Sequence, residues 1–308
     1  METVFDVSWA DAYEASPHWG GWWADTHQDG ADWPVEVKLH QNRLYHRELL
    51  CVPERYAGMV VQAHHRLLGH IGYERLLKEM ERRYQFPPGF DRVGVAQDAS
   101  RGCAVCQATQ PPNWRKKGPI AMTPIPPRVM ASVALDVFSM PSTTWQGQSY
   151  DCFVMCVDRH SGWMVARPTT DLGLTGEKAA HLFLDTSWGE FGVPSQVTSD
   201  RGAQFVSQWW LTMCARLGIR VAYSQAYRPQ ANGRAEVAGK SLMTVLRRLH
   251  AEEGINWVEA LPRALRLQHD APGPTGLAPY HIVFGRERNL HGIPYPPGQD
   301  SGDRGRIF

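Results

Sequence analysis

Three carboxylates in the second half of the chain have the residue types and settings for metal-dependent phosphate chemistry. Asp136 lies inside the apolar run 133–138, where a lone charge is costly unless it is paired or binds a metal. Asp200 follows the short segment 196–199, and Glu236 is the acid at the start of a long helical pattern. Such oxygen ligands suit Mg²⁺ or Mn²⁺, and two ions about 4 Å apart activate an attacking oxygen and stabilise a leaving one at a phosphate. Taken singly, Asp200 could be an ordinary turn residue, and Glu236 could be an acid that stabilises a helix N-terminus. A purely structural role is hardest to assign to Asp136.

Two histidines and two cysteines in the first half could hold a zinc ion. Cys103 and Cys106 form a C-x-x-C, a spacing at which two thiolates can meet one ion. His70 and either His64 or His65 would complete a tetrahedron, and the sequence leaves the choice between the adjacent histidines open. The alternative is that the histidines are ordinary helix and loop residues and the cysteines a buried pair. A proline-broken segment of about 60 residues usually needs a cross-link, which favours a structural zinc site of His64, His70, Cys103 and Cys106.

A basic stretch surrounds the third carboxylate. Residues 201–250 contain eight Lys and Arg and a single acid, Glu236, within a chain whose net charge is only +1. At about 100° per residue, one face of the helical pattern is apolar and the other carries Glu236, Lys240 and Arg247. Basic residues placed one and three turns beyond a metal-binding acid could follow a phosphate backbone. A solvated charged face is the alternative, but such a face normally mixes both signs.

The elements that would position these groups follow different patterns on the two sides of a proline-rich segment. The first part predicts a short hairpin over 44–53 and helices over 55–65 and 73–84. The second part predicts strands over 133–140, 150–158, 162–167, 196–199 and 219–223. Its predicted helices cover 175–191, 204–217, 234–250 and 257–269. Three strands followed by alternating helices and strands predict an α/β fold with helices on the faces of a sheet.

Length and composition place this chemistry in a two-domain protein. With 308 residues, 43% of them hydrophobic, the chain can bury a substantial core. We divide it into an acidic Trp-rich tail (1–40), a zinc-binding domain (41–112), a Pro-rich basic linker (113–127), a catalytic core (128–290) and a Pro/Gly-rich tail (291–308). No run reaches the 18 or more apolar residues of a membrane span, and the acidic N-terminus lacks the apolar region of a signal peptide. We therefore expect a soluble, intracellular protein.

Four motifs together resemble the retroelement integrases, most closely those of gypsy-type long-terminal-repeat retrotransposons. They are the His/His/Cys/Cys array, TSDRGAQF around Asp200, YRPQANGRAE around Glu236, and TGLAPY leading to the FGR that ends at Arg286. The offset of 36 between Asp200 and Glu236 leaves 35 intervening residues, the hallmark spacing of the family. The resemblance covers roughly residues 40–290.

The resemblance implies an RNase H-like core with a five-stranded mixed sheet, preceded by a small helical zinc domain. It assigns Asp136, Asp200 and Glu236 as the catalytic ligands of Mg²⁺ or Mn²⁺. It also places a Zn²⁺ ion in the first domain. The implied reactions are trimming of the element's 3′ ends by water and strand transfer into target DNA, carried out by a homo-oligomer on DNA in the nucleus. By position, Lys240, Gln230, Asn232 and Arg247 would contact DNA.

Some departures from the family pattern bear on these expectations. The stretch between His70 and Cys103 is a few residues longer than usual, and Gly94 and Ser100 would interrupt the helix expected there. Only about twenty residues follow Arg288, so we expect the family's β-rich C-terminal DNA-binding domain to be missing. The alternatives are a catalytically incompetent truncated integrase that only binds DNA, and a metal-dependent nuclease of the same fold. The nuclease would not call for the zinc domain.

Overall fold

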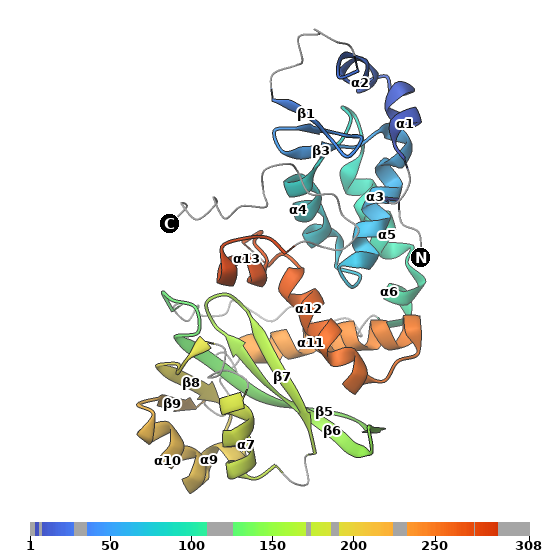
Figure 1. Cartoon of the computed structure of the whole chain (residues 1–308). Helices are drawn as coiled ribbons and strands as arrows, with labels where there is room; N and C mark the ends of the chain where they lie inside the picture. The colour runs from blue at the N-terminus through green and yellow to red at the C-terminus, as the bar shows by residue number, and fades with distance from the viewer. Residues whose placement is uncertain are drawn as a thin grey trace. The chain divides into compact units, whose positions relative to one another are not determined.

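The protein consists of two compact units in the computed structural model (Figure 1), which describes residues 4–5, 8–27, 36–109, 126–170, 174–185, 191–223, 233–273 and 275–288. The first unit takes the chain up to Gln107 together with the chain from Ala271 onward, and the second runs from Ala108 to Asp270. The linker predicted over 113–127 and the tail 291–308 lie almost entirely outside the described residues.

The first unit is built from short helices and a small sheet. Its helices are α1 (Ala10–Glu14), α2 (Gly20–Asp25), α3 (Glu54–Leu67), α4 (Tyr73–Arg83), α5 (Arg92–Arg101), α6 (Ala104–Thr109) and α13 (Pro279–Phe284). Its strands are β1 (Val37–His40), β2 (Arg43–His46), β3 (Leu49–Cys51) and β4 (Tyr84–Gln85), in that order across the sheet. The predicted hairpin is therefore part of a four-stranded sheet, whose last strand pairs in parallel with β3.

The Trp-rich N-terminal segment is part of the core of this unit, where the sequence predicts a tail. Trp9, Trp19 and Trp23 are all buried in one cluster with residues of α3 and the sheet. The indole of Trp19 donates to the carbonyl of Val52 at 2.9 Å, and an equivalent polar anchor joins Tyr13 to β3. Large aromatic side chains need no helical periodicity to be buried, which is why the sequence pattern does not reveal them.

Helix α5 forms where the sequence predicts an interruption at Gly94 and Ser100. The Asp91 side chain accepts the backbone N–H of Gly94 at 2.9 Å and so caps the helix N-terminus. A Cβ atom at position 94 would lie 2.2 Å from an Asp91 carboxylate oxygen, so glycine makes room for the cap. Here the glycine starts a helix rather than breaking one.

The second unit contains the predicted five-stranded mixed sheet, in the order β7-β6-β5-β8-β9. Its strands are β5 (Ser132–Trp145), β6 (Gln148–Asp158), β7 (Met164–Thr169), β8 (Gln196–Ser199) and β9 (Arg220–Tyr223). Its helices are α7 (Gly176–Phe183), α9 (Ala203–Val206), α10 (Gln208–Arg216), α11 (Gly233–Glu253) and α12 (Trp257–Asp270). The first three strands are antiparallel, whereas β5, β8 and β9 run in parallel. The helix predicted over 204–217 is divided at Ser207, whose side chain caps α10.

Alternation along the strands gives the sheet two buried faces. Val133 and Leu135 of β5 lie in one core cluster with residues of α7 and α10, whereas Phe138 packs against the cluster that includes α11 and α12. Figure 1 shows these two pairs of helices on opposite faces of the sheet. Even-numbered side chains of this part of β5, including Asp136, therefore share the face that α11 covers.

The segment after Asp270 belongs to the first unit, where the sequence predicts that the catalytic core continues to residue 290. Glu287, beyond α13, pairs with Arg82 and lies 3.0 Å from Arg83, both on α4. The nearly fully buried Glu79 also pairs with Arg83. Ion pairs between residues some 200 positions apart have no local sequence signal.

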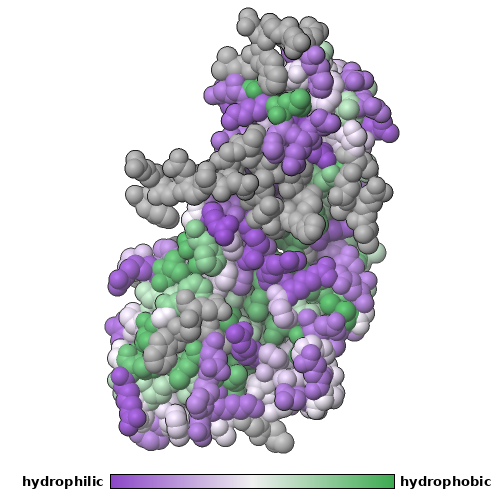
Figure 2. Space-filling model, viewed as in Figure 1, coloured by the Kyte–Doolittle hydropathy of each residue, from purple (hydrophilic) through white to green (hydrophobic). Residues whose placement is uncertain are grey.

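None of the helices within the described residues is long and apolar enough to cross a membrane. On the face drawn in Figure 2, hydrophilic and hydrophobic residues are interspersed.

Candidate active site and metal centre

The sheet register brings the two predicted aspartates to equivalent positions on neighbouring strands. Parallel pairing of β5 with β8 places Ala134 opposite Thr198. Two residues further along each strand are Asp136, still within β5, and Asp200, directly after the end of β8. The backbone N–H of Gly202 donates to Asp200 Oδ1 at 3.0 Å, which holds that exposed carboxylate at the strand end. The carboxyl ends of parallel strands are where α/β sheets gather ligands.

The third carboxylate is on the first turns of α11. Glu236 is half-buried, and its Oε2 lies 3.6 Å from Nζ of Lys240 one turn later. The opposite face of the helix is the predicted apolar one, and all four of its residues are buried: Leu242, Val245, Leu246 and Leu249. Arg247 is exposed. Gln230 and Asn232 lie outside the described residues.

The electrostatics of Asp136 connect the three acids. Burial raises the pKa of Asp136 to about 6, and the nearby charges of Asp200 and Glu236 act in the same direction. The backbone N–H of Val137, which donates to Asp136 Oδ1 at 2.9 Å, and the charge of Lys240 oppose this rise. A partly buried carboxylate beside two further acids is a site at which a cation would offset both the desolvation and the repulsion. The donor set therefore fits Mg²⁺ or Mn²⁺.

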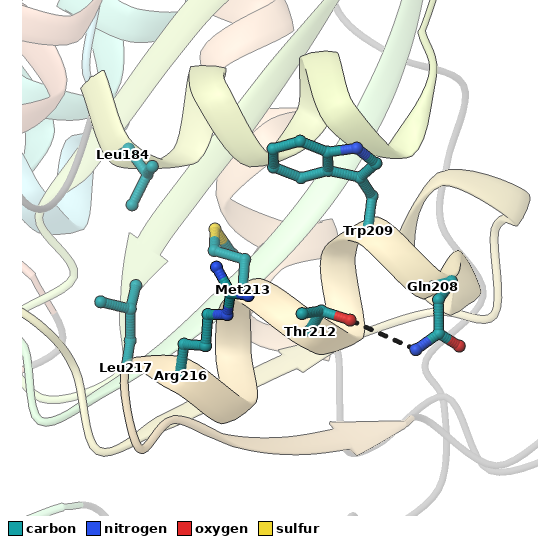
Figure 3. Close-up of a pocket in the computed structure, with 7 residues that line it drawn as sticks. All are labelled: Leu184, Gln208, Trp209, Thr212, Met213, Arg216 and Leu217. Atoms are coloured by element: carbon teal, nitrogen blue, oxygen red, sulfur yellow. Dashed lines mark hydrogen bonds between the residues drawn. The ribbon is translucent and has the colours of Figure 1, made fainter.

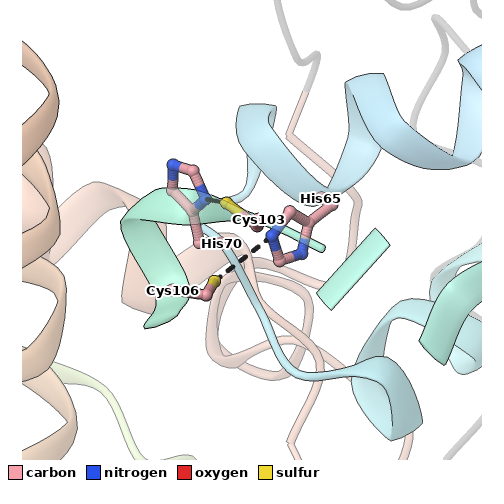
Figure 4. Close-up of side chains that lie close together, drawn as sticks. All are labelled: His65, His70, Cys103 and Cys106. Carbon is pink, nitrogen blue, oxygen red and sulfur yellow. Dashed lines mark hydrogen bonds between the residues drawn. The ribbon is translucent and has the colours of Figure 1, made fainter. Parts of the chain in front are cut away.

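A second group of ligands is gathered in the first unit. Within the described residues, one group of three or more His, Cys, Asp or Glu side chains lies close enough to hold an ion: His65, His70, Cys103 and Cys106, with ligand atoms all within 4.8 Å of one another (Figure 4). His65 Nε2 lies 3.4 Å from the thiol of Cys106, and His70 Nδ1 lies 3.2 Å from that of Cys103. Nδ1 of His65 is 2.9 Å from the carbonyl of Ile71, an interaction that fixes the ring and leaves Nε2 for a metal. Two imidazoles and two thiolates at these distances fit tetrahedral zinc.

The structure places His65 in this group and not His64. His64 is fully buried on a neighbouring face of α3, with Nδ1 3.1 Å from the hydroxyl of Tyr84 and Nε2 3.9 Å from Glu79. Burial lowers the pKa of His64 well below its usual value, and the charge of Arg83 lowers it further. Successive residues of a helix point about 100° apart, so only one of the two histidines can face the cysteines.

Asp158 is a further acid of the second unit, and its hydrogen bonds give it a structural role. Its fully buried carboxylate accepts the backbone N–H of Met130 at 3.0 Å and those of His160 and Ser161 at 3.3 and 2.8 Å. The Ser161 hydroxyl donates to it as well, at 2.6 Å. Asp158 thus joins the start of β5 to the turn between β6 and β7.

A cavity of about 430 Å³ lies between α7 and α10 and contains none of the predicted site residues (Figure 3). Its lining is mainly apolar, with Leu184, Trp209, Met213 and Leu217 beside Arg216. It is on the face of the sheet opposite Asp136.

Comparison with known proteins points to one family. Residues 126–229 match the family described as Integrase core domain, a range that includes Asp136 and Asp200 and ends before Glu236. The Gag-Pol polyprotein of Koala retrovirus is 31% identical over 252 residues, which are 78% of this chain and 14% of that protein. For the Gag-Pol polyprotein of Woolly monkey sarcoma virus the identity is 29% over 254 residues, 82% of this chain and 14% of that protein. The Pol polyprotein of Radiation murine leukemia virus (strain Kaplan) is 28% identical over 244 residues, 76% of this chain and 39% of that protein.

This chain is related to the retroelement integrases. The relatives named above are retroviral polyproteins, so the likeness is to retroviral Pol proteins rather than to the gypsy-type elements that the sequence motifs predict. The chain spans between about a seventh and two fifths of the length of these relatives.

Two solved structures resemble this integrase-related chain. One is the simian T-cell lymphotropic virus intasome in complex with PP2A regulatory subunit B56 gamma, with a TM-score of 0.45 and 19% identity, covering 78% of this chain and 79% of that one. The other is the HTLV-2 integrase catalytic core domain in complex with magnesium, in its trimeric form, with a TM-score of 0.40 and 18% identity, covering 50% of this chain and 95% of that one.

Proposed function

We propose that the chain is an integrase that carries out metal-dependent 3′-end processing and strand transfer of DNA. The observation that carries this proposal is the register of β5 and β8, which puts Asp136 and Asp200 at equivalent positions on neighbouring strands. Glu236 on α11 is close enough to raise the pKa of Asp136, and two of the three acids lie within the matched integrase core.

Asp136, Asp200 and Glu236 would hold the divalent ions, Mg²⁺ or Mn²⁺. When bound, such ions activate an attacking oxygen and stabilise the leaving oxygen of a phosphodiester. Water would be the attacking group in end processing and the new 3′-hydroxyl in strand transfer, each in line with the bond that breaks. Lys240, whose Nζ lies 3.6 Å from Glu236 Oε2, would orient that carboxylate and offer a positive charge to a phosphate oxygen. The reaction needs no covalent enzyme intermediate, so no Ser or Tyr nucleophile is assigned.

The His65, His70, Cys103 and Cys106 group is proposed as a structural zinc site. Four protein ligands leave no open coordination position, so zinc would stabilise the first domain and not take part in the reaction. On this proposal a zinc-binding domain over about residues 41–112 precedes the catalytic core that starts near residue 128.

DNA is the proposed partner, bound by a homo-oligomer in the nucleus. Lys240 and Arg247 follow one side of α11, and the exposed guanidinium of Arg247 suits a phosphate. Gln230 and Asn232, just before the helix, remain predicted DNA contacts by sequence position alone.

A disintegration assay on branched DNA tests the proposal without knowledge of the element's end sequence. We expect the wild-type chain to rejoin DNA in Mg²⁺ or Mn²⁺ and to stop when EDTA is added. Asp200→Asn and Glu236→Gln should each abolish the activity with an unchanged circular dichroism spectrum, because each loses a metal ligand. Asp185→Asn, which changes an exposed acid on the other side of the sheet, is the matched control and should retain activity.

Two other outcomes would replace the proposal. Cutting without joining would favour a nuclease of the same fold. A folded wild-type chain that binds DNA but neither cuts nor joins would favour a catalytically incompetent DNA-binding protein.

A further inference from the structure

A glycine of helix α11 lies against a side chain of strand β5. Gly239 is buried, and a Cβ atom at this position would lie 2.0 Å from Cζ of Phe138 and 2.4 and 2.5 Å from its two Cε atoms. Real Cβ atoms essentially never come within 3.0 Å of another group. The phenyl ring therefore fills the space that any side chain at position 239 would need.

The ring of Phe138 is supported from its other side. It stacks on Phe153 of β6, with ring centroids 5.2 Å apart and an angle of 21° between the planes. The strand register pairs the same two residues, and Phe153 is fully buried with its ring 6.3 Å from that of Trp257. Phe138 is itself partly buried, and its stacking on the fully buried Phe153 restricts movement of the ring away from the helix.

This contact lies next to two of the three carboxylates. Phe138 is two residues after Asp136 on β5, so both side chains are on the face that α11 covers. Gly239 is three residues after Glu236, so both lie on the same side of the helix, one turn apart. The thickness of the Phe138 ring thus separates the backbone of β5 from that of α11, next to Asp136 and Glu236.

We propose that Phe138 and Gly239 form a spacer that sets the separation between Asp136 and Glu236, and hence their ability to hold divalent cations together. Neither residue carries a metal-ligating group, so both act as positioning residues. The inference rests on the proposed function, since it concerns the same metal site.

The size of the effect follows from the contact distance. An alanine at position 239 must move 1.4 Å further from Phe138 Cζ to reach 3.4 Å, where ordinary contact begins. A misplacement of about 1 Å at reacting groups can reduce a rate about 100-fold, and disturbed support of metal ligands weakens metal binding about 10- to 100-fold. Phe138→Leu removes the three ring atoms that would meet the Cβ of an alanine at position 239. Gly239→Ala and Phe138→Leu should therefore compensate each other.

The test compares Gly239→Ala, Phe138→Leu and the double variant in the full chain. We measure direct Mn²⁺ binding by electron paramagnetic resonance and calorimetry, together with the disintegration rate. Gly239→Ala should weaken Mn²⁺ binding at least about tenfold and slow joining about 100-fold. The double variant should recover both to within a few-fold of wild type. Gly58→Ala is the matched control, a helical glycine of α3 with nothing within 4 Å of its added Cβ, and should change neither quantity.

Several results would overturn the spacer. The proposal is wrong if Gly239→Ala binds Mn²⁺ and joins DNA as well as wild type does. It is also wrong if the double variant folds but is as defective in both quantities as Gly239→Ala. If Gly239→Ala alone does not fold, a double variant that folds and binds Mn²⁺ like wild type still supports the spacer, and one that folds without binding overturns it. A wild-type chain that binds Mn²⁺ but joins no DNA contradicts the proposed reaction and leaves the binding comparison intact. A wild-type chain that binds no Mn²⁺ contradicts both.

Discussion

Asp136→Asn should separate stability from catalysis, because the carboxylate proposed to bind the cation is also a partly buried charge. In the protein without metal, burial and the charges of Asp200 and Glu236 raise the pKa of Asp136 from 3.8 to about 6. A carboxyl group with a raised pKa in the folded state favours folding while it is protonated. Its ionisation reduces the free energy of unfolding as the pH rises from about 4 to about 6. Above pH 6 the penalty is present in full.

The pKa change sets an upper limit on this penalty. A rise of about two units corresponds to about 3 kcal/mol. Because the Asp136 side chain is only partly buried, solvent screening reduces this to about 1–2 kcal/mol. Asparagine has the same shape, and its carbonyl oxygen can still accept the N–H of Val137. At pH 8 and without metal, Asp136→Asn should therefore raise the melting temperature of the catalytic unit by about 2–8 °C, using about 2–4 °C per kcal/mol for a domain of this size.

Calorimetric melting of wild type and Asp136→Asn at pH 4, 6 and 8, with EDTA or with Mg²⁺, measures the effect. The stabilisation by Asp136→Asn should be large at pH 8 and small at pH 4, where the wild-type carboxyl is mostly protonated in the folded state and carries little buried charge. Mg²⁺ should raise the melting temperature of wild type at pH 8 and have little effect on the variant, which should also fail to join DNA. Asp185→Asn, at an exposed site, is the control and should leave the melting temperature close to that of wild type. A variant less stable than wild type at pH 8, or a gain equally large at pH 4, would refute the reasoning.

Three further perturbations test other parts of the structure. His65→Asn should lose bound zinc while His64→Asn retains it, measured by atomic absorption after dialysis; loss in His64→Asn alone would contradict the arrangement around Cys106. Asp158→Ala should reduce the free energy of unfolding by about 3–4 kcal/mol in urea titration, because it leaves several buried N–H groups without an acceptor; a loss below 1 kcal/mol would show that these contacts matter little. Glu287→Gln should destabilise the first unit by about 1–2 kcal/mol, because Arg83 then has less compensating charge. Because the ion pair is largely buried, 1 M NaCl should leave much of that loss in place.

The carboxylates could be predicted from the sequence because their signals are local. A charged residue in an apolar strand, an acid directly after a strand and an acid at the start of a helix are each visible within ten residues of chain. The alternation of β5 also indicates that Asp136 and Phe138 share one face. Burial of the apolar face of α11 is confirmed for the same reason, since helical periodicity depends only on the spacing of neighbouring residues.

The choice between His64 and His65 could not be made from the sequence. Both are on α3, and the one that faces the cysteines depends on how α3 packs against the turn before α6, about forty residues away. The burial of Trp9 and Trp19 likewise depends on a surface formed by later elements. The return of Glu287 to α4 is a contact between distant parts of the chain that no periodicity encodes.

The sequence by itself determined the candidate residues for metal chemistry and the elements that carry them, because residue type and periodicity are properties of short segments. Only the tertiary structure decided which histidine joins the cysteines, where the N-terminal tryptophans pack, and that Gly239 lies against Phe138. Each of these depends on the distance between segments far apart in the chain, and that distance is fixed by packing of the whole domain.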